Sequence, residues 1–295
     1  MTEREELRYL ADLFDDPDEV VSSCVDKRIA EMGHEVIPEL ERMRHNEPDP
    51  VFKRILSDRI LRYNAEFRTA DLRRYALHEA TQPTTLYEGC FLASSLLNPQ
   101  ITRDRFEEAF YQCACEFQAE ASDNRTALEE IGVFNHLFYH RLRFTVCDQN
   151  LTSAKNAMLY DTLKSRRGNP FAIATVYMML AEEVGLPLLP LCFPGGFVPA
   201  YVEDGKELFY VNLMQNGEVF PQTRLKDYLI GQGIPFDHNR FLLRRQTVML
   251  NIYLESLGYL FEKTGDDASC ERIMKALDAL GDERFLLTED KQEED

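Results

Sequence analysis

Cysteine and histidine carry the most reactive side chains in this chain, and their positions decide which reactions it could support. Cys192 stands between Leu191 and Phe193 in a short apolar run, and His140 or His238 could act as its base. A thiol paired with an imidazole is typical of cysteine-dependent hydrolases and acyltransferases. A thiol becomes reactive when a cation or a helix N-terminus lowers its pKa, and the local sequence provides neither. We expect Cys192 to be a buried apolar thiol and keep it as the alternative nucleophile.

Metal ligation is the second chemistry to consider. Cys113 and Cys115 are two positions apart in a helical pattern, so we expect them on different sides of the helix, and no second pair follows at zinc spacing. His136 and His140 are one helical turn apart, but they lack the Glu of a His-Glu-x-x-His motif and a third ligand. We predict no metal site and no cofactor.

One long apolar helix dominates residues 160–220. Gly168 and Pro170 mark its beginning, because proline at the first helical position loses no hydrogen bond and presets φ. Gly185 and Pro187 mark its end. A helix that is apolar nearly all round is buried. Its apolar positions include Phe171, Ile173, Ala174, Val176, Tyr177, Met178, Leu180 and Ala181.

Three short runs rich in β-branched and aromatic residues follow this helix, at 188–193, 197–202 and 208–213. Asp204 and Gly205 form a hairpin signal between the second and the third run. A buried helix against an antiparallel sheet is typical of papain-like and transglutaminase-like folds, in which the nucleophile lies at the helix N-terminus. We therefore predict an α+β fold with such a core.

Three motifs in this region carry a family resemblance. They are Arg167-Gly168-Asn169-Pro170, Pro194-Gly195-Gly196-Phe197, and the stretch from Asn212 to Gly217. They resemble the Arg-Gly-x-Pro turn, the Pro-x-His-Phe strand and the Asp or Asn with a later Gly of the transglutaminase-like family typified by SirB1. Upstream residues in comparable places extend the resemblance; they are Phe144, Asn150, Asn156 and Leu163.

The resemblance implies a catalytic triad whose positions are degenerate in this chain. Phe171 stands at the helix start, where no Cys, Ser or Thr occurs before Thr175. Gly196 replaces the expected histidine, and Asn212 can orient an imidazole but has none to orient. Because a nucleophile is indispensable to covalent catalysis, we predict a catalytically silent domain. The candidate ligand groove consists of Asn169, Gly195, Gly196, Tyr210 and Asn212.

Composition limits the classes of partner. The net charge is −18, from 51 acidic and 33 basic residues, and short basic pairs are too few for a nucleic-acid interface. No apolar run is long enough for a membrane span, and the charged N-terminus does not resemble a signal peptide. Seven scattered cysteines are an odd number and do not form a disulfide framework. We expect a cytoplasmic protein that binds neither nucleic acid nor membrane.

Helical patterns flank the core on both sides. An N-terminal helix pair looks like a HEAT-type repeat, and a C-terminal helical hairpin resembles a tetratricopeptide (TPR) unit. The acidic tail is expected to be disordered. The predicted regions are 1–82 HEAT-like, 83–235 transglutaminase-like core with preceding helices, 236–287 TPR-like hairpin, and 288–295 tail.

These observations predict a catalytically silent transglutaminase-like protein that binds a protein or peptide or acts as a scaffold. The alternative is a cysteine-dependent hydrolase or acyltransferase with re-sited catalytic residues, centred on Cys192.

Overall fold

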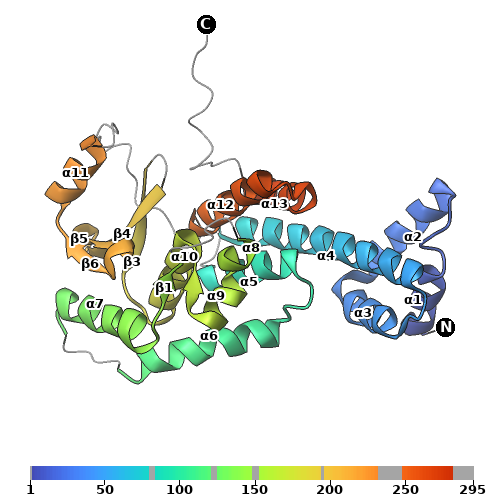
Figure 1. Cartoon of the computed structure of the whole chain (residues 1–295), viewed down its shortest axis with the longest axis horizontal. Helices are drawn as coiled ribbons and strands as arrows, with labels where there is room; N and C mark the ends of the chain where they lie inside the picture. The colour runs from blue at the N-terminus through green and yellow to red at the C-terminus, as the bar shows by residue number, and fades with distance from the viewer. Residues whose placement is uncertain are drawn as a thin grey trace, which may run out of the picture.

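The computed structural model describes residues 2–79, 84–120, 125–147, 153–193, 196–231 and 248–281. Its N-terminal helices form a bundle around their own apolar core, at one end of the molecule (Figure 1). The bundle consists of α1 (Glu3–Ala11), α2 (Glu19–Met32), the 3-10 turn η1 (Gly33–Glu35), α3 (Val36–Asn46) and the first half of α4 (Pro50–Glu79).

Helix α4 is longer than the apolar pattern at residues 51–63 indicates, because it continues to Glu79. Its second half leaves the N-terminal bundle and contributes Leu72 and Tyr75 to the main core. In between, the buried Asn64 donates its side-chain amide to the carbonyl oxygen of Ser95 at 2.7 Å. The second half is helical because it packs on the core, which a local pattern does not reveal.

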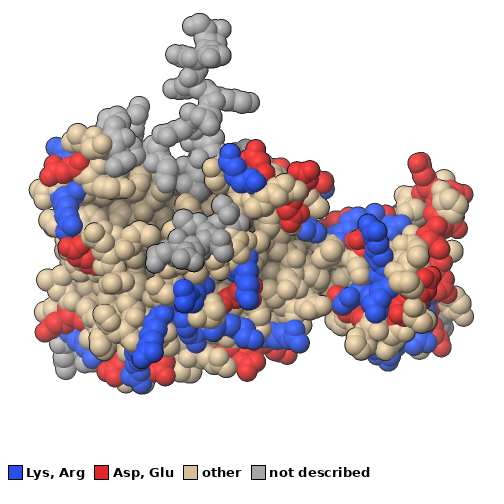
Figure 2. Space-filling view, viewed as in Figure 1, with Lys and Arg blue, Asp and Glu red and all other residues tan. Residues whose placement is uncertain are grey.

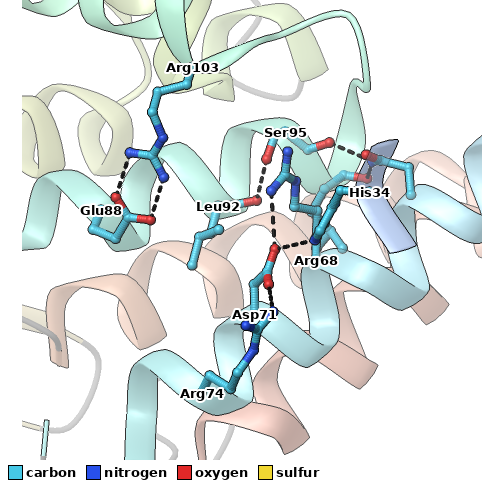
Figure 3. A network of polar contacts seen from close by, with 10 residues as sticks. His34, Arg68, Asp71, Arg74, Glu88, Leu92, Ser95 and Arg103 are labelled. Carbon is cyan, nitrogen blue, oxygen red and sulfur yellow. Dashed lines mark hydrogen bonds and ion pairs between the residues drawn. The ribbon is translucent and has the colours of Figure 1, made fainter. Parts of the chain in front are cut away.

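A polar network joins η1 of the N-terminal bundle to the second half of α4 (Figure 3). Asp71 accepts from His34 Nε2 at 2.8 Å and from Arg68 Nη1 at 3.1 Å, and it also pairs with Arg74. Burial alone would raise the pKa of Asp71, but the hydrogen bond from His34 and the nearby arginine charges outweigh it and lower the pKa. The carboxylate therefore stays charged and holds η1 against α4.

The main core surrounds the buried helix α10 (Pro170–Glu183), as the apolar pattern predicts. The helical stretch that begins at Ala127 becomes π-helical at His136 and ends at Arg141, and Arg143 then takes a φ of 60°. The other helices of this part are α5 (Leu86–Leu97), α6 (Arg103–Gln118), α7 (Ala127–Asn135), the π-helical turn η2 (His136–Arg141), α8 (Ala154–Ala157) and α9 (Leu159–Ser165).

A four-stranded antiparallel sheet in the order β3-β4-β5-β6 lies between two helical layers. One face contributes residues such as Val211 to the core around α10, and the other packs Ala200 and Leu191 against α11. The α+β class predicted from the sequence is confirmed. The elements are β3 (Leu188–Phe193), β4 (Gly196–Glu203), β5 (Lys206–Asn212), the 3-10 turn η3 (Leu213–Gln215), β6 (Glu218–Phe220) and α11 (Gln222–Gly231).

A second, two-stranded sheet lies beside the start of α10, where β1 (Thr145–Val146) pairs in parallel with β2 (Arg167–Gly168). The C-terminal helices α12 (Val248–Thr264) and α13 (Asp267–Leu280) share the core of α10, and α13 also contacts α4. The predicted hairpin region thus has no separate core among the described residues. None of the described helices has the length and apolar character needed to cross a membrane. The predicted tail lies outside the described residues.

Glu182, in the last turn of α10, is expected to make stability depend on pH. Burial raises its pKa to about 7, although the backbone N–H of Leu86 at 2.6 Å and that of Tyr87 partly offset this. The folded state therefore holds an extra proton between about pH 4.5 and 7, and stability falls as pH rises through that window. Between pH 5 and pH 8, the free energy of unfolding of Glu182→Gln should fall by about 1–2 kcal/mol less than that of the wild type.

Thermal unfolding between pH 5 and pH 8 measures the effect, with the exposed hairpin residue Glu203 changed to Gln as the matched control. The Glu182→Gln protein should be more stable than wild type at pH 8 and similar at pH 5. A wild-type pH profile that Glu182→Gln leaves unchanged would assign the dependence to other groups.

Candidate functional site

The N-terminus of α10 is held by its capping residue. Asn169 Oδ1 accepts from the backbone N–H of Ala172 at 2.8 Å, and the backbone N–H of Asn169 donates to the carbonyl oxygen of Asn156 at 2.6 Å. Pro170 then occupies the first turn without losing a hydrogen bond. Asn169 is buried, and it lies outside the lining of the nearby groove. This member of the predicted groove therefore caps the helix.

The groove beside this helix start has a cavity volume of about 540 Å³. It brings together Phe171, Gly196 and Asn212, the three positions that the sequence identifies as degenerate, from α10, β4 and the end of β5. Helix α11 forms the remaining wall. The other lining residues are Pro170, Ala174, Phe193, Phe197, Val198, Pro199, Val211, Leu213, Met214, Gln215, Phe220, Arg224, Leu225 and Tyr228.

The chemistry of this lining is apolar and aromatic. Among the described residues, no Cys, Ser, Thr, His, Asp or Glu lines the groove. Its one charged residue, Arg224, donates to the carboxylate of Glu218 at 2.8 Å and lies over the Phe220 ring. The groove can accommodate an apolar side chain, and its described lining has no group for moving a proton at neutral pH.

Asn212 is oriented by its own loop. Its Oδ1 accepts from the backbone N–H of Met214 at 3.1 Å, and its Nδ2 donates to Gln215 Oε1 at 3.1 Å. These bonds begin the 3-10 turn η3. The carboxamide is thus fixed at the groove wall, with one acceptor lone pair of Oδ1 still open to a ligand.

Two other predicted groove residues have different placements. Tyr210 projects to the face of the sheet opposite Val211, where it packs under α11 with Leu225. Its hydroxyl donates to Glu207 at 2.9 Å, and burial raises the pKa of that hydroxyl. Tyr210 does not line the groove, although Leu225 beside it does, because its side chain is enclosed between β5 and α11. Gly195 lies outside the described residues.

Cys192 is 4% exposed, and its Sγ is 3.8 Å from the carbonyl oxygen of Pro190. It does not line the groove. His140 is exposed on η2, with its ring 5.4 Å from that of His136, and His238 lies outside the described residues. Among the described residues, no hydrogen bond joins Cys192 to His140 or to another histidine.

The sequence did not reveal what holds the groove wall in place. Asn135 donates to the carbonyl oxygen of Gly217 at 2.7 Å and accepts from the Tyr177 hydroxyl at 2.7 Å. Tyr139 donates to the carbonyl oxygen of Leu213 at 3.1 Å. These bonds tie η3 and the start of β6 to α7, η2 and α10. Asn216-Gly217 is a residue pair typical of turns, but nothing in the sequence marks Asn135 as its partner.

The family comparison agrees with this architecture. Residues 104–247 match the profile of the transglutaminase-like superfamily. A UPF0162 protein from Vibrio cholerae is 24% identical over 150 residues, which are 51% of this chain and 55% of the relative. The UPF0162 protein PM0557 from Pasteurella multocida is 28% identical over 112 residues, 38% of this chain and 42% of the relative.

A shorter stretch is similar to a eukaryotic protein. The human F-box only protein 21 is 25% identical over 113 residues, which are 35% of this chain and 18% of the relative. The matched region thus spans about half of the UPF0162 proteins and about a fifth of the F-box protein. No solved structure matches.

Proposed function

We propose that the transglutaminase-like superfamily domain of residues 104–247 binds a segment of another protein in its groove and does not turn it over. The observation that carries the proposal is the convergence of Phe171, Gly196 and Asn212 on one cavity. A nucleophile and a base would have to face this space for acyl transfer, and an aromatic ring and a glycine occupy the two positions instead.

The dimensions and rim of the groove favour a bulky apolar side chain. Its volume of about 540 Å³ falls within the range of about 300–1,000 Å³ that is usual for ligand sites. Met214 and Tyr228, which line the groove, are 53% and 58% exposed. Large apolar side chains exposed beside an apolar cavity are typical of interaction sites.

The helical regions support a scaffolding role. We propose that the HEAT-like pair α2 and α3, the TPR-like hairpin α12 and α13, and the SirB1-type core form one protein-binding scaffold. Seven free cysteines fit a reducing cytoplasm, and the charge of −18 opposes nucleic-acid binding.

Binding can be tested with immobilised nine-residue peptides that carry Phe, Tyr, Leu or Ala at the centre of a neutral polar sequence. We expect the full chain to retain the Phe, Tyr and Leu peptides and not the Ala peptide. Met214→Ser/Tyr228→Ser should weaken binding about tenfold, since it removes apolar contact at the rim. The matched control Leu208→Ser/Tyr259→Ser removes similar exposed side chains elsewhere.

Two results would contradict the proposal. Equal loss of binding in both double variants would show that the groove is not the site. Turnover would be shown by fast alkylation of Cys192 at neutral pH, together with hydrolysis or acyl transfer from a glutamine-containing peptide that Cys192→Ala abolishes.

A further inference from the structure

A cluster of basic residues lies beside the start of α10. The parallel pairing of Thr145 with Arg167 places the chain before β1 next to the end of α9. Lys and Arg side chains accordingly gather on the face over α9 and β1, although the whole chain carries a charge of −18 (Figure 2). We call Arg143, Lys164 and Arg167, with the half-buried Arg166, the basic cluster.

The basic cluster has no carboxylate partners among the described residues, unlike many of the other arginines. Arg28, Arg59 and Arg103 each lie within 3.0 Å of an Asp or Glu oxygen. Within the described ranges, none of the four residues of the basic cluster forms an ion pair. Unneutralised cations on a strongly acidic protein create a local positive potential that attracts an anionic group.

Arg166 is held in place by its neighbours. Its guanidinium lies 5.2 Å from the centre of the Phe144 ring. Burial raises the pKa of Cys113, and the Arg166 guanidinium partly offsets this. The Nη1 atom of Arg166 is buried and has no hydrogen-bond partner among the described residues. Arg143 and Arg166 also have φ values of 60° and 62°, a conformation that L-residues adopt at a cost of about 1 kcal/mol. Both of these strained residues belong to the basic cluster.

The basic cluster is close to the groove along the chain. Arg167 precedes Pro170, a groove residue, by three positions, so their Cα atoms are at most about 11 Å apart. One extended peptide of four or five residues spans that distance. A single ligand can therefore place an apolar side chain in the groove and a charged group at the cluster.

We infer that the partner segment of the groove carries acidic residues about three to six positions away from its bulky apolar residue. This inference rests on the proposed function and adds the chemical class of the partner. The negative charge of the protein does not prevent the contact, because the Debye length is about 8 Å at physiological salt and local charges dominate. Arginine and lysine clusters recognise carboxylates through charge-assisted hydrogen bonds.

Fluorescence anisotropy of labelled ten-residue peptides tests the inference on the full chain. One neutral polar sequence carries a Phe and, four positions away, three Asp residues; two others replace the Asp residues by Asn or the Phe by Ala. We expect the Asp peptide to bind at least tenfold more tightly than the Asn peptide at 50 mM NaCl. The difference should shrink at 300 mM NaCl.

Protein variants separate this inference from the proposed function. Arg143→Ala/Lys164→Ala/Arg167→Ala should bind the Asp peptide no better than the Asn peptide. Lys27→Ala/Arg54→Ala/Arg73→Ala removes the same charge from other exposed positions and should leave the preference intact. Equal binding of the Asp and Asn peptides to wild type overturns the inference alone. Failure of every Phe-containing peptide to bind overturns the proposed function as well.

Discussion

Gly217→Ala should destabilise the protein by about 3–5 kcal/mol. Gly217 has a φ of 79°, and a methyl group added there would overlap the side-chain amide of Asn135. That amide cannot simply move away, because it bonds both the Gly217 carbonyl oxygen and the Tyr177 hydroxyl. The substitution therefore adds steric overlap and the loss of partly buried hydrogen bonds to the backbone strain.

Urea unfolding of Gly217→Ala and Gly205→Ala separates these contributions. Gly205 has a φ of 73° in the β4–β5 hairpin, and no atom lies within 4 Å of a Cβ added there. Gly205→Ala should lower the free energy of unfolding by only about 1 kcal/mol, which is the cost of the positive φ alone. Asn135→Ala should also cost less in the Gly217→Ala background than in wild type. Similar losses for the two glycine variants would exclude the overlap with Asn135.

Phe171→Cys/Gly196→His should create a reactive thiol in the groove. Position 171 is in the first turn of α10, where the helix dipole favours a thiolate, and a histidine at position 196 would face the same cavity. A Cβ at position 196 would have the Phe193 ring at 3.6 Å as its nearest contact, an ordinary van der Waals distance. Asn212 Oδ1 could then accept from the imidazole and orient it.

Alkylation by iodoacetamide at pH 7, with the modified residue located by mass spectrometry, measures this effect. In the double variant, the introduced thiol should react at least tenfold faster than the exposed Cys115. The thiol of the single variant Phe171→Cys should react at a rate between these two. Leu208→Cys provides an exposed thiol away from the helix start as the control. If the double variant reacts no faster than Leu208→Cys, the three positions do not form the geometry of a triad.

Local sequence determined the elements that build this site. Pro170 and the Asn169 cap begin α10 where the turn pattern places them, and the stretch from 172 to 181 is buried as predicted. The first three strands of the main sheet were also predictable, because their composition and the Asp204-Gly205 turn are local signals. The identities of Phe171 and Gly196 were enough to question the triad before any geometry was known.

Tertiary structure alone decided what surrounds those positions. Tyr210 is enclosed under α11 because β5 alternates its side chains and places this ring on the face that α11 covers. Asn135 and Gly217 are 82 positions apart, and α11 brings Arg224 and Tyr228 into the groove. Long-range partners like these depend on how layers pack, whereas caps, turns and buried helices follow from neighbouring residues. The sequence therefore revealed which reactive groups are missing, and only the folded chain showed which groove remains.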